Sequence, residues 1–173
     1  FSACLMAATG FFNVASPFII QVSLKYSAVT FGKMVLLTGL AWFLGNIINR
    51  FLFHVAVSIK ILCGLSTILI TSLILLILSL QGHFSLSLLM IPMFIAAFGF
   101  ALTLGSAAGR ALSLFPKQAG TASALLGAMQ MSGASLLVFI TQYLNLSTPE
   151  LIGTHFLLLI PFSYLLFRYA KYA

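Results

Sequence analysis

Long apolar runs alternate with short polar breaks along the whole chain. A helix needs roughly 20 apolar residues to cross the ~30 Å hydrocarbon core of a bilayer, and six runs approach or exceed that length. They lack the two-residue alternation of membrane-barrel strands. The pattern therefore predicts six transmembrane helices, over residues 1–21, 34–53, 59–80, 85–109, 119–143 and 151–167.

The six runs differ in how uniformly apolar they are. The runs at 59–80 and 151–167 are the most uniformly apolar. Ser and Thr hydroxyls within such helices can donate to the carbonyl four residues earlier, so they need no partner helix. The other four runs contain Gly, Asn, Gln or Trp. We expect the third and sixth helices to face lipid. Since the connections are too short to fold alone, residues 1–173 form a single all-α membrane domain.

Composition supports this class. Of the 173 residues 62% are hydrophobic and 5% are charged, whereas soluble domains carry roughly 25% charged residues. Residue 1 already lies in an apolar run, so no secretory signal pattern is recognisable. The chain does not begin with Met, and we expect it to be an excerpt of a longer protein.

The cationic residues predict how the helices are oriented. Short cytoplasmic loops are enriched in Lys and Arg. Most of the cations lie in the second and fourth connections and in the C-terminal tail, which predicts that these segments and both ends of the chain are cytoplasmic. The net charge of +7 comes from cations at helix ends without interleaved stacking aromatics, so we expect no nucleic-acid partner. The cations on the predicted cytoplasmic side are Arg50, Lys60, Arg110, Lys117, Arg168 and Lys171, and those on the other side are Lys25 and Lys33.

The first run carries a polar cluster within the membrane. Thr9, Asn13 and Ser16 share one helix face. Pro17 has no N–H for the Asn13 carbonyl to accept, which predicts a kink at this point. Two interpretations remain open: an interhelical hydrogen bond that holds the bundle, or a hinge beside a polar cavity.

The second run has a comparable polar stripe. Trp42 lies about eight residues from the predicted cytoplasmic end, deeper than an aromatic belt requires. This depth argues against the role of an interface anchor. The stripe consists of Thr38, Trp42, Gly45, Asn46 and Asn49.

The fifth run begins with many small residues. Small side chains let helix backbones approach closely in lipid, which predicts a packing seam. Gln130 cannot face lipid without leaving amide hydrogen bonds unmade, so it meets either a partner helix or a wet cavity. The seam positions are Ser123, Gly127, Gln130 and Ala134 here, and Gly105 and Gly109 in the fourth run.

The histidines, cysteines and the single glutamate are not arranged as in a catalytic or metal site. The three histidines lie at or near span ends and are not paired with other ligands at metal-binding spacing. Cys4 and Cys63 are isolated, so no disulfide framework follows. We expect no enzyme activity, metal or cofactor. The only acidic side chain, Glu150, lies outside the six runs, so a group that couples transport to protons is expected elsewhere.

Three stretches resemble a known family. They read "ASPFIIQ" at 15–21, "GNIINRFL" at 45–52 and "ALSLFPKQAGTASALLGAMQMSGAS" at 111–135. They are similar to the C-terminal half of a drug:proton antiporter of the major facilitator superfamily, in its Bcr/CflA multidrug-resistance branch. The resemblance implies a twelve-helix protein in the bacterial inner membrane, with an N-terminal six-helix half absent from this chain. It also implies export of small amphipathic compounds in exchange for protons by alternating access.

The resemblance implies roles for residues already singled out. The substrate cavity would be lined by the first, second, fourth and fifth spans. Asn49 and Arg50 would occupy a cytoplasmic latch, although an acid often stands at the position of Asn49 in the family. The substrate-cavity residues would be Asn13, Ser16, Trp42, Asn46 and Gln130, and the hinge and packing residues Pro17, Gly105, Gly109 and Gly127.

A second reading of the same pattern belongs to a different functional class. The chain would be a six-span structural or assembly subunit of a membrane complex, or an inactive transporter remnant. In that case partner helices would seal the polar faces. A water-soluble thiol reagent separates the two, because a cavity admits it and a sealed seam does not.

Overall fold

Serine caps mark where two of the long helices begin. The computed structural model describes residues 2–81, 85–142, 164 and 168. Helix α2 (Ala28–Phe51) is preceded by Ser27, whose hydroxyl accepts a hydrogen bond from the Thr30 N–H at 3.2 Å. Helix α4 (Leu86–Ser113) is preceded by Ser85, which accepts from the Leu88 N–H at 3.3 Å. Each serine satisfies one of the N–H groups that a helix start leaves unpaired.

The described chain is helical throughout its long elements. Five helices are long and apolar enough to cross a membrane, which confirms the predicted all-α class in the described residues. The sixth predicted span, 151–167, lies outside the described residues except at Tyr164. The elements are α1 (Ser2–Phe18), the π-helical turn η1 (Ile19–Ser23), α2, α3 (Val57–Leu80), α4, the 3₁₀ turn η2 (Pro116–Gln118) and α5 (Ala119–Gln142).

Two helix boundaries differ from the predicted ones by four residues or more. The second span was predicted to begin at residue 34, but the helix begins at Ala28 because Ser27 caps it and apolar residues follow. The fourth span was predicted to end at 109, but α4 continues through Arg110 to Ser113. Lys33 and Arg110 thus lie within helices, where long cationic side chains can extend toward the membrane surface.

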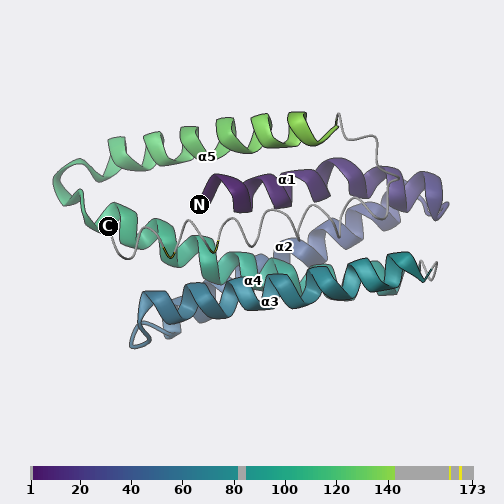
Figure 1. Ribbon diagram of the computed structural model, residues 1–173, viewed down its shortest axis with the longest axis horizontal. Helices are drawn as coiled ribbons and strands as arrows, with labels where there is room; N and C mark the ends of the chain where they lie inside the picture. Colours follow the sequence, from purple (N-terminus) through teal and green to yellow (C-terminus); the bar gives the residue numbers. More distant parts are fainter. Residues whose placement is uncertain (1, 82–84, 143–163, 165–167, 169–173) are drawn as a thin grey trace.

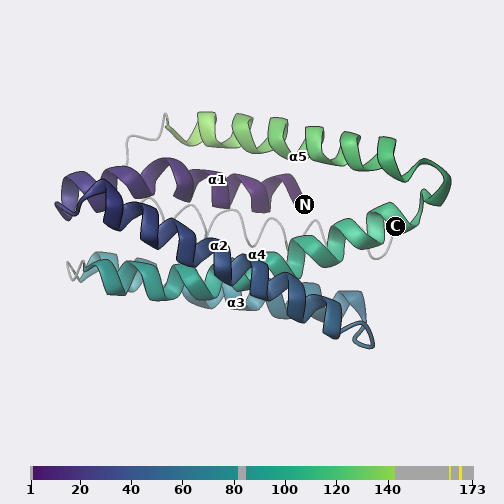
Figure 2. The same ribbon diagram turned by 180° about the vertical axis from the view of Figure 1, so that it is seen from behind.

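The helices run antiparallel to their neighbours in the chain (Figure 1). Helix α5 lies beside α1, and α4 packs against both α2 and α3. The α2–α3 and α4–α5 connections lie at one end of the molecule, and the α1–α2 connection lies at the other (Figure 2). The first end carries Arg50, Lys60, Arg110 and Lys117, while Lys25 and Lys33 belong to the second.

Close approach of backbones makes α4 the central helix. A methyl group on Gly99 of α4 would lie 2.9 Å from the Gly64 carbonyl oxygen of α3. A methyl group on Gly45 of α2 would lie 2.7 Å from the Ala101 Cβ of α4. Both distances are shorter than real carbon contacts, so the two helix pairs need glycine at these positions.

Helix α3 is two-sided, as expected for a peripheral helix. One face is buried against α4 through Ile61, Leu65 and Ile68, while Ile70 and Ile77 on the other face are exposed. Its hydroxyls bond back to the helix as predicted: the Ser72 Oγ donates to the Ile68 carbonyl at 2.6 Å. The hydroxyls of Thr67, Thr71 and Ser72 thus bond within their own helix and need no partner helix.

A single apolar core joins α1 to α3 and α4. Its largest fully buried side chains include Leu5, Ile19, Ile68, Leu89 and Phe100. This core holds one face of α1 in place.

Candidate functional site

Two polar residues of α1 lie one turn apart at the edge of the core. Thr9 is half-buried, and its Oγ1 donates to the Met6 carbonyl at 2.9 Å. Asn13 is exposed, and its side-chain amide has no hydrogen-bond partner within the described part of the chain. In a membrane helix such an amide is unfavourable against lipid, so it favours a wet environment.

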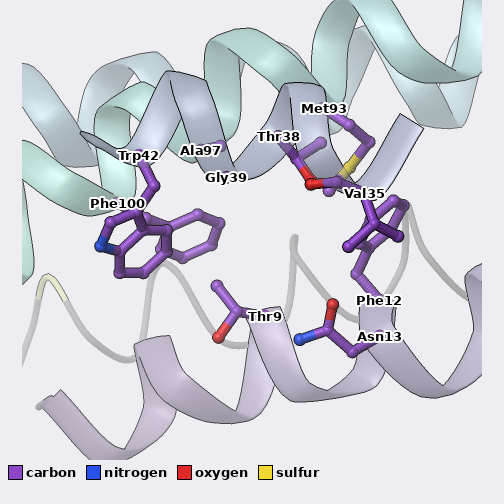
Figure 3. A pocket seen from close by; sticks show the side chains of 10 residues that line it. All are labelled: Thr9, Phe12, Asn13, Val35, Thr38, Gly39, Trp42, Met93, Ala97 and Phe100. Carbon is purple, nitrogen blue, oxygen red and sulfur yellow. The ribbon is translucent and has the colours of Figure 1, made fainter. Parts of the chain in front are cut away.

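The first cavity lies between α1, α2 and α4. It has a volume of about 230 Å³. Figure 3 shows Thr9 and Asn13 pointing from α1 toward the side chains of α2 and α4 across it. The full lining is Thr9, Phe12, Asn13, Val35, Thr38, Gly39, Trp42, Met93, Ala97 and Phe100.

An aromatic pair closes one end of this cavity. Trp42 of α2 stacks on Phe100 of α4, with ring centroids 6.2 Å apart and ring planes inclined by 12° (Figure 3). Phe100 is fully buried in the core, and Trp42 is half-buried above it. The pair therefore presents a flat apolar wall to the cavity, of the kind that packs against planar ligands.

A second cavity lies on the other side of the same two polar residues. It has a volume of about 460 Å³ between α1 and α5, and Thr9 and Asn13 line it as well. Ser135 contributes a hydroxyl from α5. Thr9 and Asn13 thus form a polar wall between the two cavities, which together are lined from α1, α2, α4 and α5. Its full lining is Met6, Thr9, Gly10, Asn13, Val14, Met131, Ala134, Ser135, Val138 and Phe139.

Three of the predicted cavity residues lie elsewhere. Ser16 is 1% exposed, and its Oγ has no hydrogen-bond partner among the described residues. Further along α1 the face shared with Thr9 is covered by the core, which includes Ile19 and Ile20. Gln130 is half-buried on α5 and Asn46 is exposed on α2, and neither lines either cavity.

The face of α5 that meets α1 coincides with the predicted seam only at Ala134. Ala134 is buried there, and a methyl group on Gly133 would lie 2.8 Å from the Ala3 Cβ of α1. Gly127 has open space where a side chain would begin. Gly133 was missed because spacing along one helix cannot say which of several small faces meets a partner.

The small residues of α4 divide in the same way. A methyl group on Gly105 would lie 2.8 Å from the Asn49 Nδ2 and 2.9 Å from the Asn46 Oδ1, so glycine is used for close packing there. Gly109 has open space instead. The closest approaches to the backbone of a neighbouring helix involve Gly45, Gly64 and Gly99. The spacing of Gly99 and Thr103, four residues apart, was the available signal for the α3–α4 contact.

The asparagines of α2 bind within the bundle. The Asn46 Nδ2 donates to the Trp42 carbonyl at 2.9 Å, and the Asn49 Oδ1 accepts from the Ser106 Oγ of α4 at 2.9 Å. Asn49, expected at a latch toward another half, thus links α2 to α4. Arg50 is exposed in the last turn of α2.

The described residues offer no metal site. No group of three or more His, Cys, Asp or Glu side chains in the described ranges is arranged to hold an ion. Cys4 is buried, Cys63 is exposed, and both are free. Pro17 stands in the last turn of α1, directly before the π-helical turn η1.

Comparisons of the chain with protein-family models, curated proteins and solved structures found no match. The site is a pair of cavities among helices that are long and apolar enough to span a membrane. A polar wall divides the two cavities, and stacked aromatic rings close one end of the first. Such a site can hold a ligand that is largely apolar and carries a polar group.

Proposed function

We propose that the chain is one half of a membrane transporter that exports small amphipathic compounds. The observation that carries the proposal is the polar wall of Thr9 and Asn13, which lines two cavities inside helices apolar enough to span a bilayer. Polar side chains facing cavities at membrane depth are characteristic of substrate paths. The resemblance of 111–135 to the C-terminal half of drug:proton antiporters supports the same function.

The proposed substrate contacts follow from the chemistry of the lining. The flat wall of Trp42 and Phe100 accommodates an aromatic or aliphatic body, and the Asn13 amide offers both a donor and an acceptor to a polar group. Few of these contacts are directional. A site of this composition favours a broad set of amphipathic compounds over one exact shape.

Energy coupling is assigned to a partner half. The chain has one acidic side chain, Glu150, which lies outside the described residues, and none lies in α1 to α5. A proton-coupled exporter needs a titrating group within the membrane. We therefore propose a second six-helix bundle, in the bacterial inner membrane, that supplies this group and rocks against the present one.

Cysteine labelling tests whether the polar wall is wet. In a background with Cys4 and Cys63 replaced by serine, Asn13→Cys is expected to react with a water-soluble maleimide in membranes. Ile74→Cys, on the exposed apolar face of α3, is the control and is expected to stay unlabelled in lipid. Protection of Asn13→Cys equal to that of Ile74→Cys would favour the structural-subunit alternative, in which partner helices seal this face.

Efflux measurements test the role of the wall in transport. Asn13→Ala removes the amide from both cavities and is expected to lower efflux of at least one amphipathic dye by about tenfold, the effect of roughly 1.4 kcal/mol. Gln130→Ala is the matched control, because this amide of α5 lines neither cavity. Drug accumulation in energised cells is the measurement. Equal effects of the two variants would contradict the assignment.

A further inference from the structure

The connection between α4 and α5 exposes apolar side chains between two cations. Leu114 is 72% exposed and Phe115 is 54% exposed. Arg110 in the last turn of α4 and Lys117 in η2 flank them, and both are exposed. Large apolar side chains are unfavourable in a fully aqueous loop. At the boundary between acyl chains and headgroups, the apolar and the cationic side chains are both accommodated.

A groove lies directly beneath this connection. It has a volume of about 280 Å³ and is lined by α4, η2 and α5, which diverge from this point (Figure 1). It shares no residue with the two cavities of the polar wall. Its lining is mainly apolar and consists of Ala111, Leu112, Phe115, Gln118, Thr121, Ala122, Leu125, Leu126 and Met129.

Two cations stand next to lining residues of the groove in the chain, and they are taken as its rim. Arg110 immediately precedes the lining residue Ala111, and Lys117 immediately precedes the lining residue Gln118. No carboxylate side chain occurs in the described part of the chain, so no acidic side chain there pairs with either cation. An apolar floor below an unneutralised cationic rim complements a molecule with an acyl chain and an anionic headgroup.

We propose that this groove binds an anionic phospholipid of the cytoplasmic leaflet. One acyl chain lies along the apolar lining between α4 and α5, and the headgroup phosphate lies between Arg110 and Lys117. The lipid fills the space where the two helices diverge. The site requires only the predicted orientation of the helices and is independent of what the protein transports.

Photo-crosslinking tests the site directly. The natural-length protein, reconstituted in nanodiscs, is exposed to phosphatidylglycerol that carries a photoreactive acyl chain, and crosslinked peptides are identified by mass spectrometry. We expect crosslinks within 111–129, with phosphatidylglycerol exceeding a phosphatidylcholine probe of the same chain. Equal crosslinking by the two lipids, or none in this range, would overturn the proposal.

Two variants separate the headgroup from the acyl chain. Each cation near an anionic surface contributes roughly a fivefold change in affinity, so Arg110→Gln with Lys117→Gln is expected to weaken phosphatidylglycerol binding about 25-fold. Lys25→Gln with Lys33→Gln is the matched control and is expected to change it little. Ala122→Trp fills the groove and is expected to reduce crosslinking while both cations remain.

Inorganic phosphate distinguishes a lipid site from a simple anion site. Millimolar phosphate is expected to leave phosphatidylglycerol crosslinking unchanged, because it cannot occupy the apolar floor. Complete competition by phosphate, or undiminished crosslinking in the Ala122→Trp variant, would rule out the lipid. A loss in the Lys25 and Lys33 control equal to that in the rim variant would also count against it, as it would show a general charge effect.

Discussion

Glycines at helix contacts show how single residues decide the packing of this bundle. Gly45, Gly64 and Gly99 lie where a methyl group would meet neighbouring atoms at distances below ordinary contact. Gly32 and Gly127 also lie within long helices, but a methyl group on either would face open space. Since lipid provides no hydrophobic force between helices, close backbone approach is a main source of attraction. The first group therefore matters for stability and the second does not.

Replacing Gly99 by Ala is expected to destabilise the protein by about 1–3 kcal/mol, because the added methyl overpacks the α3–α4 contact. Gly32→Ala is the matched control in α2, and is expected to be neutral or stabilising by about 0.5–1 kcal/mol through helix propensity. Reversible unfolding in mixed micelles measures both. A Gly99→Ala protein as stable as Gly32→Ala would show that α3 and α4 do not pack this closely.

Helix α1 combines a proline with a change of helical period. Pro17 stands in the last turn of α1, and the five residues that follow the end of this helix form the π-helical turn η1. The Leu24 N–H bonds the Ile19 carbonyl at 2.9 Å, five residues away in place of four. π-turns often occur at functional sites, and proline removes a further hydrogen bond of the ladder. The end of α1 is thus locally weakened close to the polar wall.

Pro17→Ala is expected to raise stability by about 1 kcal/mol, since the Asn13 carbonyl regains a helical donor. Transport is expected to fall at the same time, because a stiffer α1 bends less when the two proposed halves rock against each other. Pro92→Ala in α4 serves as the control, a helix proline with no π-turn after it. Thermal midpoints and dye efflux measure the two effects. Unchanged efflux in a more stable Pro17→Ala protein would remove the hinge role of this turn.

Across the whole molecule, the cations are separated along the length of the helices, whereas the cavities lie between neighbouring helices. Among the cations between α1 and α5, four gather at the end that holds the α2–α3 and α4–α5 connections, and two belong to the opposite end. The cavities extend sideways, between α1 and its neighbours α2, α4 and α5. By the positive-inside rule, this charge separation predicts how the bundle is oriented across the membrane, whereas the cavities define the face proposed to meet a partner half.

Impermeant labelling of single cysteines tests that orientation, again with Cys4 and Cys63 replaced by serine. Tyr26→Cys and Gln81→Cys lie in the connections at the less cationic end and are expected to react in intact cells. Ala56→Cys, in the α2–α3 connection, is expected to react only after the membrane is opened. The reverse pattern would place the cationic end outside, against the positive-inside rule.

Prediction from sequence succeeded where a property belongs to one segment. Helix class, the apolar length of the spans and the back-bonding of hydroxyls in α3 all follow from local composition. The helix starts were less accurate, because the cap at Ser27 was not recognised and the second helix begins six residues earlier than predicted. Asn13 was predicted to meet either a partner helix or a cavity, and it lines the first cavity together with Trp42. Contact of either residue with a substrate stays a prediction.

The amino-acid sequence alone determined that this chain consists of apolar helices with cations at their ends, because hydrophobic length and charge are summed over neighbouring residues. Tertiary structure decided which small and polar faces meet. Ser16 and Thr9 share a helix face, yet packing buries one and leaves the other on a cavity. The same holds for Gly105 and Gly109. Contacts between helices depend on their rotation and crossing, which no single segment encodes.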